Sequence, residues 1–184
     1  GSPYIDLRTD IASFLPQSLN KKDTSYIINK YLNIIKKKPE LHDKIQFELV
    51  ETCFSFLSND RLKKLFPGNI VKRYLKSLSI LTTKIIKEDN MLTEINKVSI
   101  LKKQLNLISQ SNLSDIQKIF YIIKLTKNLG TLPFSGLARC AFISQRILLD
   151  LKELNLISNY EFNKFFNSIN SITNEFSKDF LKLK

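Results

Sequence analysis

The sequence contains few of the residues from which covalent cross-links and metal sites are built. Its 184 residues include two cysteines and one histidine. Cys53 and Cys140 lie far apart with no Cys-x-x-Cys pair, which excludes a disulfide framework and is typical of small buried residues in a reducing compartment. A single histidine excludes a multi-histidine zinc site. We therefore expect no metal site and no bound cofactor in this chain.

The sequence also lacks the motifs of familiar enzymes. Its four glycines form no phosphate-binding loop, and neither a G-x-S-x-G motif nor a metal-spaced carboxylate cluster is present. No apolar run reaches the length of a membrane span, and no signal peptide is visible. We expect a cytoplasmic binding or connecting domain that makes no membrane contact, contains no catalytic residue and is inactive by itself.

The net charge of +12 raises the question of nucleic-acid binding. The lysines are scattered, however, and only residues 36–38 form a short run. Nucleic-acid-binding proteins usually concentrate charge on one face, with arginine and aromatic residues placed for base contacts. Here arginine is scarce and the aromatic residues occupy apolar helical positions. A basic, nucleic-acid-binding helical bundle therefore remains only as an alternative function. We expect the partner of this chain to be something other than a nucleic acid.

Helical periodicity dominates the chain from residue 23 onward, without convincing strand alternation. The hydrophobic fraction of 43% and the thirteen phenylalanines argue against disorder. We predict an all-α fold, a single domain over residues 3–184 arranged as a bundle or orthogonal array of about seven helices. Gly1 and Ser2 look like a scar of tag cleavage.

Asp23 or Thr24 can cap a first expected helix, which buries Ile27, Tyr31, Ile34 and Ile35. The other expected helices are 39–57, 69–88, 91–108, 114–130, 133–156 and 158 to the C-terminus, with a short helix or extended arm at 7–16 and a turn at 59–65. The helix over 39–57 is expected to bury Leu41, Ile45, Leu49, Cys53 and Phe56. Ser114 can cap the helix that it begins, and Ser158 with Glu161 forms a capping box.

Residues 129–142 are the most distinctive segment. Gly130 can adopt the left-handed conformation that ends a helix, and Pro133 suits the first turn of the next. In that next helix Arg139 shares a polar ridge with Arg146 and Asp150. The planar guanidinium of Arg139 could bind the carboxylate of a ligand, or it could pair with a neighbouring acidic side chain. The spacing leaves both interpretations open.

Residues 39–57 contain a second polar pattern. Lys44, Glu48 and Glu51 share one face of the expected helix, which predicts a ladder of ion pairs. Pro39 begins this helix, and His42 lies in its first turn at the edge of the apolar stripe. A helix start opposes protonation, so a neutral imidazole is expected there. His42 is therefore either a structural residue or a hydrogen-bonding partner for a ligand.

Three segments in order carry a resemblance to a known family. They are residues 7–11 with 14–16, residues 39–44 with 47–48, and residues 130–134 with 136–139 and 141–142; similarity extends through 167–169. Together they resemble the central helical region of phosphoenolpyruvate-synthase-like kinases from polysaccharide and capsule gene clusters, the L-glutamine kinases of capsular phosphoramidate synthesis among them. Ser135 and Cys140 depart from that family, which typically has alanine or histidine there.

The resemblance implies a middle domain excised from a three-part enzyme. An ATP-grasp domain would precede it and a phosphohistidine domain would follow it. The intact enzyme would use ATP and Mg²⁺, release AMP and phosphate, and pass a phosphoryl group to a small acceptor such as glutamine. The middle domain would bind the acceptor or connect its neighbours. The alternative is a non-catalytic helical protein-interaction module.

The resemblance and the polar patterns together predict seven acceptor-binding residues. We expect polar contacts from Arg8, His42, Lys44, Glu48 and Arg139, and a binding loop shaped by Thr131 and Phe134. For glutamine, Arg139 would bind the α-carboxylate, and His42 or Glu48 would orient the amide or the amine. Such a domain assists phosphoryl transfer through positioning.

Overall fold

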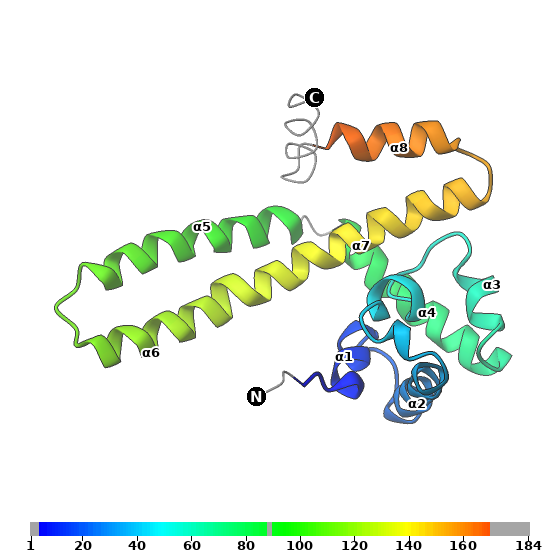
Figure 1. Ribbon diagram of the computed structural model, residues 1–184, viewed down its shortest axis with the longest axis horizontal. Helices are drawn as coiled ribbons and strands as arrows, with labels where there is room; N and C mark the ends of the chain where they lie inside the picture. Colours follow the sequence, from blue (N-terminus) through cyan, green and yellow to red (C-terminus); the bar gives the residue numbers. More distant parts are fainter. Residues whose placement is uncertain (1–3, 88–89, 170–184) are drawn as a thin grey trace.

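The computed structural model describes residues 4–87 and 90–169, and it is all-α in that part of the chain (Figure 1). The α-helices are α1 (Leu7–Phe14), α2 (Lys21–Lys37), α3 (Ser58–Lys63), α4 (Gly68–Lys87), α5 (Asn90–Ser109), α6 (Asp115–Thr126), α7 (Leu132–Glu153) and α8 (Asn159–Ser168). A 3₁₀ turn η1 (Pro39–Leu41) and two π turns, η2 (Ile45–Leu49) and η3 (Lys127–Thr131), complete the structure. The predicted fold class is thus confirmed.

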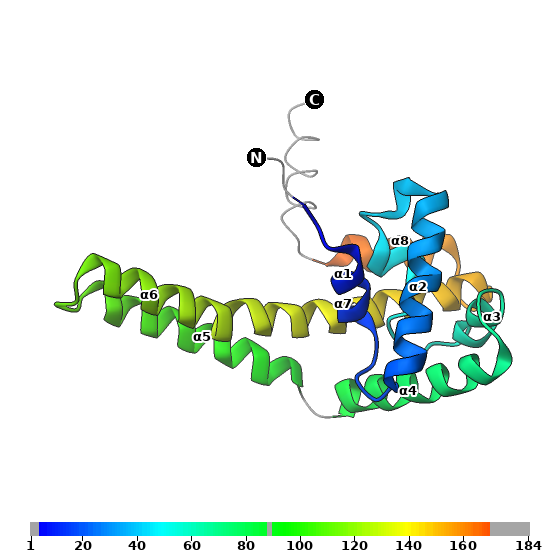
Figure 2. The same ribbon diagram turned by 90° about the horizontal axis from the view of Figure 1, so that it is seen from below.

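The helices form a body and a projecting arm. The body contains α1 to α4, and within it α1 and α2 lie side by side (Figure 2). The arm is a hairpin of α5 and α6 that extends away from the body in both views (Figures 1 and 2). Helix α7 continues from the arm across the body, and α8 follows it.

The hydrophobic core lies in the body. Tyr31 of α2 and Tyr74 of α4 are fully buried, and the ring of Phe66 packs edge-on against both, with centroid distances of 5.4 and 6.2 Å. The periodicity correctly predicted Ile27 and Ile35 as core residues. Burial of such large side chains supplies most of the free energy that stabilises a domain of this size.

Helix starts follow the capping patterns of the sequence in two cases. Ser114 with Gln117, and Ser158 with Glu161, form complete capping boxes at α6 and α8. The prediction that Asp23 or Thr24 caps the first long helix was wrong. Asn20 caps α2 by accepting a hydrogen bond from the Asp23 amide, so the helix begins at Lys21. The α8 helix ends at Ser168, and its expected continuation lies outside the described residues.

Residues 39–57 do not form the predicted helix. After η1 and η2 the chain becomes extended at Val50, and Phe56, expected in the core, is 62% exposed. Side chains from distant helices bind the backbone in place of helical partners: the Tyr74 hydroxyl donates to the Glu51 carbonyl at 2.7 Å, and the Phe54 amide donates to the Thr82 hydroxyl at 2.8 Å. The turn expected at 59–65 is instead helix α3.

Helices α6 and α7 are joined through η3 into one continuous rod (Figure 1). The predicted helix stop at Gly130 was wrong, since no described glycine has positive φ. The Leu132 amide donates to the Lys127 carbonyl across the wider π turn, immediately before Pro133, which lacks an amide hydrogen. The π turn thus accommodates the proline without ending the helix. The left-handed residue lies instead at Asn155 (φ 56°), beyond the end of α7.

Because Gly130 lies inside a continuous helical rod, the effect of replacing it on the free energy of unfolding can be predicted. A Cβ at this position would meet the Cδ2 atom of Leu101 at 3.2 Å, the end of a flexible side chain. Because alanine favours helix over glycine, we expect Gly130→Ala to leave the free energy of unfolding unchanged or to raise it by up to about 1 kcal/mol. Urea unfolding followed by circular dichroism measures this. A loss of more than about 1 kcal/mol would indicate the left-handed conformation that the structure lacks.

Candidate functional site

Arg61 of α3 bridges two buried carboxylates. Its Nε donates to Oε2 of Glu51 at 2.7 Å and its Nη1 to Oδ1 of Asp150 at 2.6 Å. The side chain of Asp150 is fully buried and that of Glu51 is 6% exposed. The Ser58 hydroxyl adds a donor to Glu51 at 2.9 Å, and the Leu57 amide adds one to Asp150 at 2.7 Å. These bonds tie the irregular segment 50–57 to α3 and α7.

The environment of Asp150 favours its charged form. Burial by itself would raise the pKa of this carboxyl group, but hydrogen bonds from Arg61, Ser55 and the Leu57 amide outweigh that effect. The pKa of Asp150 therefore lies below its ordinary value. A buried carboxylate held in this way is a fixed negative charge at neutral pH.

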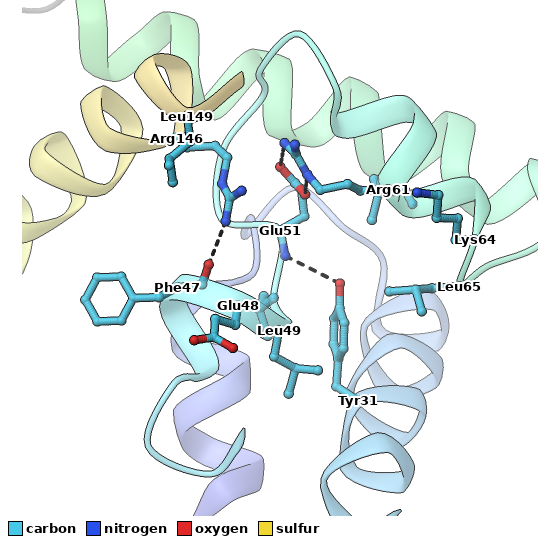
Figure 3. A pocket seen from close by; sticks show the side chains of 12 residues that line it. Tyr31, Phe47, Glu48, Leu49, Glu51, Arg61, Lys64, Leu65, Arg146 and Leu149 are labelled. Atoms are coloured by element: carbon cyan, nitrogen blue, oxygen red, sulfur yellow. Dashed lines mark hydrogen bonds and ion pairs between the residues drawn. The ribbon is translucent and has the colours of Figure 1, made fainter. Parts of the chain in front are cut away.

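Two cavities lie beside this cluster. One, of about 440 Å³, is bordered by η2, α3 and α7, and the other, of about 220 Å³, by η2 and α7. Phe47, Glu48, Arg146 and Leu149 line both cavities. We call the hollow around these four residues the Arg146 groove. Figure 3 shows the Arg146 guanidinium directed at the Phe47 carbonyl, above the turn that carries Glu48.

Arg146 is half-buried and keeps unused donors. Its Nη2 donates to the Phe47 carbonyl at 2.6 Å, and no ion pair joins it to a carboxylate in residues 4–87 and 90–169. Arg146 lies one helical turn before Asp150 on α7, so the Arg61–Asp150 bond fixes the turn that presents it. Beside it the groove offers a carboxylate, Glu48, and apolar walls from Phe47 and Leu149. A cation, an anion and apolar surface together suit a small zwitterionic ligand.

The three segments that carry the family resemblance meet at one aromatic cluster. The ring of Phe142 on α7 packs against Phe47 at 5.3 Å and against Phe14 at 6.2 Å between centroids. Phe142 and Phe47 both line the smaller cavity. Phe14, Phe47 and Phe142, which lie far apart in the sequence, therefore converge beside the Arg146 groove.

Two of the predicted site residues come together in the structure. Lys44 and Glu48 form an ion pair at 3.6 Å, with both side chains about half exposed. Glu51, expected as the third member of this ladder, is instead turned inward to Arg61, because the helix ends before it. Of the seven predicted site residues, Glu48 is the one that lines the Arg146 groove.

Arg139 contacts backbone carbonyls rather than an acidic side chain. It donates to the Ser13 carbonyl at 2.7 Å and to the Phe14 carbonyl at 3.3 Å, which ties α7 to the end of α1. Of the two interpretations that the sequence left open, pairing of Arg139 with a neighbouring acidic side chain is therefore wrong. Burial lowers the pKa of Arg139, and the side chain borders a separate cavity of about 460 Å³ that also contacts Leu15 and Leu81.

The remaining predicted residues lie on the surface. Arg8 donates to the Asn29 side chain at 3.0 Å, and the Nδ1 atom of His42 is 2.8 Å from the Pro39 carbonyl. Thr131 and Phe134 are exposed at the start of α7, Phe134 by 71%. Arg8, His42 and Arg139 thus contact different neighbours, and no contact joins any two of them among the described residues.

Sequence reasoning missed Arg61 and did not select Arg146. Arg61 lies in a segment that was expected to be a turn, and its carboxylate partner Asp150 is 89 residues away. The sequence did contain a signal for Arg146, because this residue shares the polar ridge of Arg139 and Asp150. The ridge alone does not tell which arginine borders a cavity, because that depends on how η2 packs on α7.

Comparisons with protein-family models, with curated proteins and with solved structures found no match to this chain. Across the described residues, no helix is both long and apolar enough to cross a membrane. The same part of the chain contains no cluster of three or more His, Cys, Asp or Glu side chains suited to a metal ion.

Cys53 is buried and Cys140 half-buried, and both are free thiols. Burial raises the pKa of the Cys53 thiol to about 11, so it is protonated at neutral pH.

The buried cluster predicts a pH-dependent stability. Asp150→Asn removes one partner of Arg61 while Glu51 remains, so we expect it to lower the free energy of unfolding at neutral pH by about 2 to 3 kcal/mol. The pKa of Asp150 is lower in the folded than in the unfolded chain, so its contribution is full above the ordinary value of 3.8 and is lost as the pH falls through the folded value. The difference from wild type should therefore shrink as the pH falls below 3.8.

Urea unfolding at neutral and acidic pH measures this difference. Asp60→Asn, which changes an exposed carboxylate on the same short helix as Arg61, is the matched control and should cost less than about 0.5 kcal/mol at either pH. An Asp150→Asn difference that is equally large at both pH values would mean that the Asp150 charge does not contribute.

Proposed function

We propose that this chain is the acceptor-binding middle domain of a phosphoenolpyruvate-synthase-like, AMP-forming phosphotransferase, and that the acceptor is a small amino acid such as glutamine. The observation that carries this proposal is the Arg146 groove, where a guanidinium with unused donors and a carboxylate, Glu48, line the same cavities. The family resemblance supports it, because its three segments meet beside this groove at Phe142.

The groove assigns a role to each of its polar side chains. The planar fork of Arg146 binds the α-carboxylate of the acceptor, since arginine matches carboxylate geometry through two parallel hydrogen bonds. Glu48 accepts hydrogen bonds from the α-ammonium group. Phe47 and Leu149 contact the methylene groups of the acceptor and exclude water from one side.

The domain contributes to phosphoryl transfer by holding the acceptor in place. Positioning and charge stabilisation supply most of the catalysis in such reactions, so a domain without a phosphate carrier can still be essential. ATP, Mg²⁺ and the phosphohistidine belong to the flanking ATP-grasp and phosphohistidine domains in this proposal. A cytoplasmic location follows from its dependence on ATP.

A second candidate function is a helical protein-interaction module. The arm favours it, because none of the side chains in residues 91–126 is buried although many are large and apolar. The two functions are compatible, since the arm and the Arg146 groove involve different residues.

Calorimetric titration with glutamine tests the acceptor site. We expect saturable binding that Arg146→Gln weakens at least about tenfold, since a bidentate charged contact is lost. Glu48→Gln should weaken binding of glutamine but not of N-acetylglutamine, which has no ammonium group. Lys72→Gln removes an exposed positive charge on α4 and is the control that should leave binding unchanged.

Two results would contradict the assignment. Absence of glutamine binding to the wild-type chain would reject this acceptor. Binding that survives Arg146→Gln but is lost in Arg139→Ala would move the site to the Arg139 cavity. Circular dichroism of each variant separates loss of binding from loss of folding.

A further inference from the structure

Helix α6 presents apolar side chains on two opposite faces. One face, with Leu125 half-buried, packs against α5. Four side chains on the other face are each more than half exposed: Ile116 by 82%, Ile119 by 57%, Phe120 by 66% and Ile123 by 64%. At about 100° per residue, these four positions fall within a stripe about 100° wide. We call this row the α6 stripe.

The α6 stripe differs from the single exposed apolar side chains that are common on protein surfaces. Single exposed isoleucines are normal on proteins, but a contiguous row is typical of an interaction surface. A helix that is apolar on all sides is usually buried, yet no residue of α6 is buried here. The spacing i, i+3, i+4, i+7 is the pattern with which one helix packs against another.

The charge around the stripe indicates what kind of helix would cover it. Residues 90–131 contain six lysines and two acidic residues, Glu94 and Asp115, a net charge of +4 in a chain of net charge +12. Lys124 directly follows Ile123, the last residue of the stripe, and Lys127 lies one helical turn beyond it. A second copy of the chain would bring the same positive charge to the interface, whereas an acidic partner would be attracted and oriented.

We propose that the α6 stripe docks an amphipathic helix of a partner protein whose apolar row is flanked by aspartate and glutamate. The apolar rows of the two helices interdigitate, and the acidic flanks face Lys124 and Lys127. The short straight row and the packing of the opposite face against α5 suit a single helix better than a lipid surface. This inference is independent of the acceptor site, because no stripe residue lines the Arg146 groove.

The test uses a fluorescent helical peptide with leucines at i, i+3, i+4 and i+7 and glutamates on both flanks, and a twin with lysines in place of the glutamates. By fluorescence anisotropy at low salt, the glutamate peptide should bind the chain at least about tenfold more tightly than the lysine peptide. The double variant Ile119→Ser/Ile123→Ser should weaken that binding at least about tenfold. Ile86→Ser, which changes an isoleucine of α4 that is 63% exposed, is the matched control and should bind like wild type.

Several outcomes would overturn the proposal. Equal binding of the two peptides would show that charge does not select the partner. Stripe-dependent self-association in analytical ultracentrifugation would identify a second copy as the occupant, and stripe-dependent binding to phosphatidylglycerol vesicles but not to the glutamate peptide would identify a membrane. Glutamine binding, measured on the same variants, should not change, so failure of this proposal and failure of the acceptor site are distinguishable.

Discussion

The arrangement of the chain depends on the bridge that Arg61 forms between Glu51 and Asp150. Segment 50–57 has no regular structure, and its backbone groups are bound by side chains from α2, α3, α4 and α7. Asp150 is the group through which α7 enters this network. Because α6, η3 and α7 form one rod, the same bond that fixes Asp150 against the body also fixes the direction of the arm. The guanidinium of Arg61, which is half-buried, therefore couples the core, the groove and the arm.

The body and the arm are stabilised in different ways. The body buries large side chains around Tyr31 and Tyr74, whereas the arm consists of two helices that contact each other and leave their outer faces exposed. Local opening costs least where few apolar contacts are buried. The arm is thus expected to exchange its amide hydrogens faster than the body, and it gains the most from a partner. An uncovered apolar surface of this kind is retained in proteins mainly where it is used for binding.

Local patterns predicted much of the fold, and long-range contacts account for the rest. The helices α4 and α5 and the capping boxes of α6 and α8 depend on residues a few positions apart, so the sequence displays them directly. The segment after Leu49 is decided by Tyr74, Thr82 and Asp150, which lie 23 to 93 residues away. Gly130 and Pro133 indicate a break between helices, but a π turn satisfies the same constraint without one. No local pattern distinguishes these two solutions.

At the candidate site, too, local sequence motifs and long-range packing give different information. The three segments singled out in the sequence contact one another through the rings of Phe14, Phe47 and Phe142, so their residues take part in packing around α7. Polar residues inside such segments can share that structural role, as Arg139 does when it ties α7 to the end of α1. A motif therefore locates the region where elements converge, but it does not identify the residues that bind a ligand. That assignment requires a side chain with unused donors or acceptors beside a cavity, a condition that Arg146 meets, with Glu48 lining the same cavities.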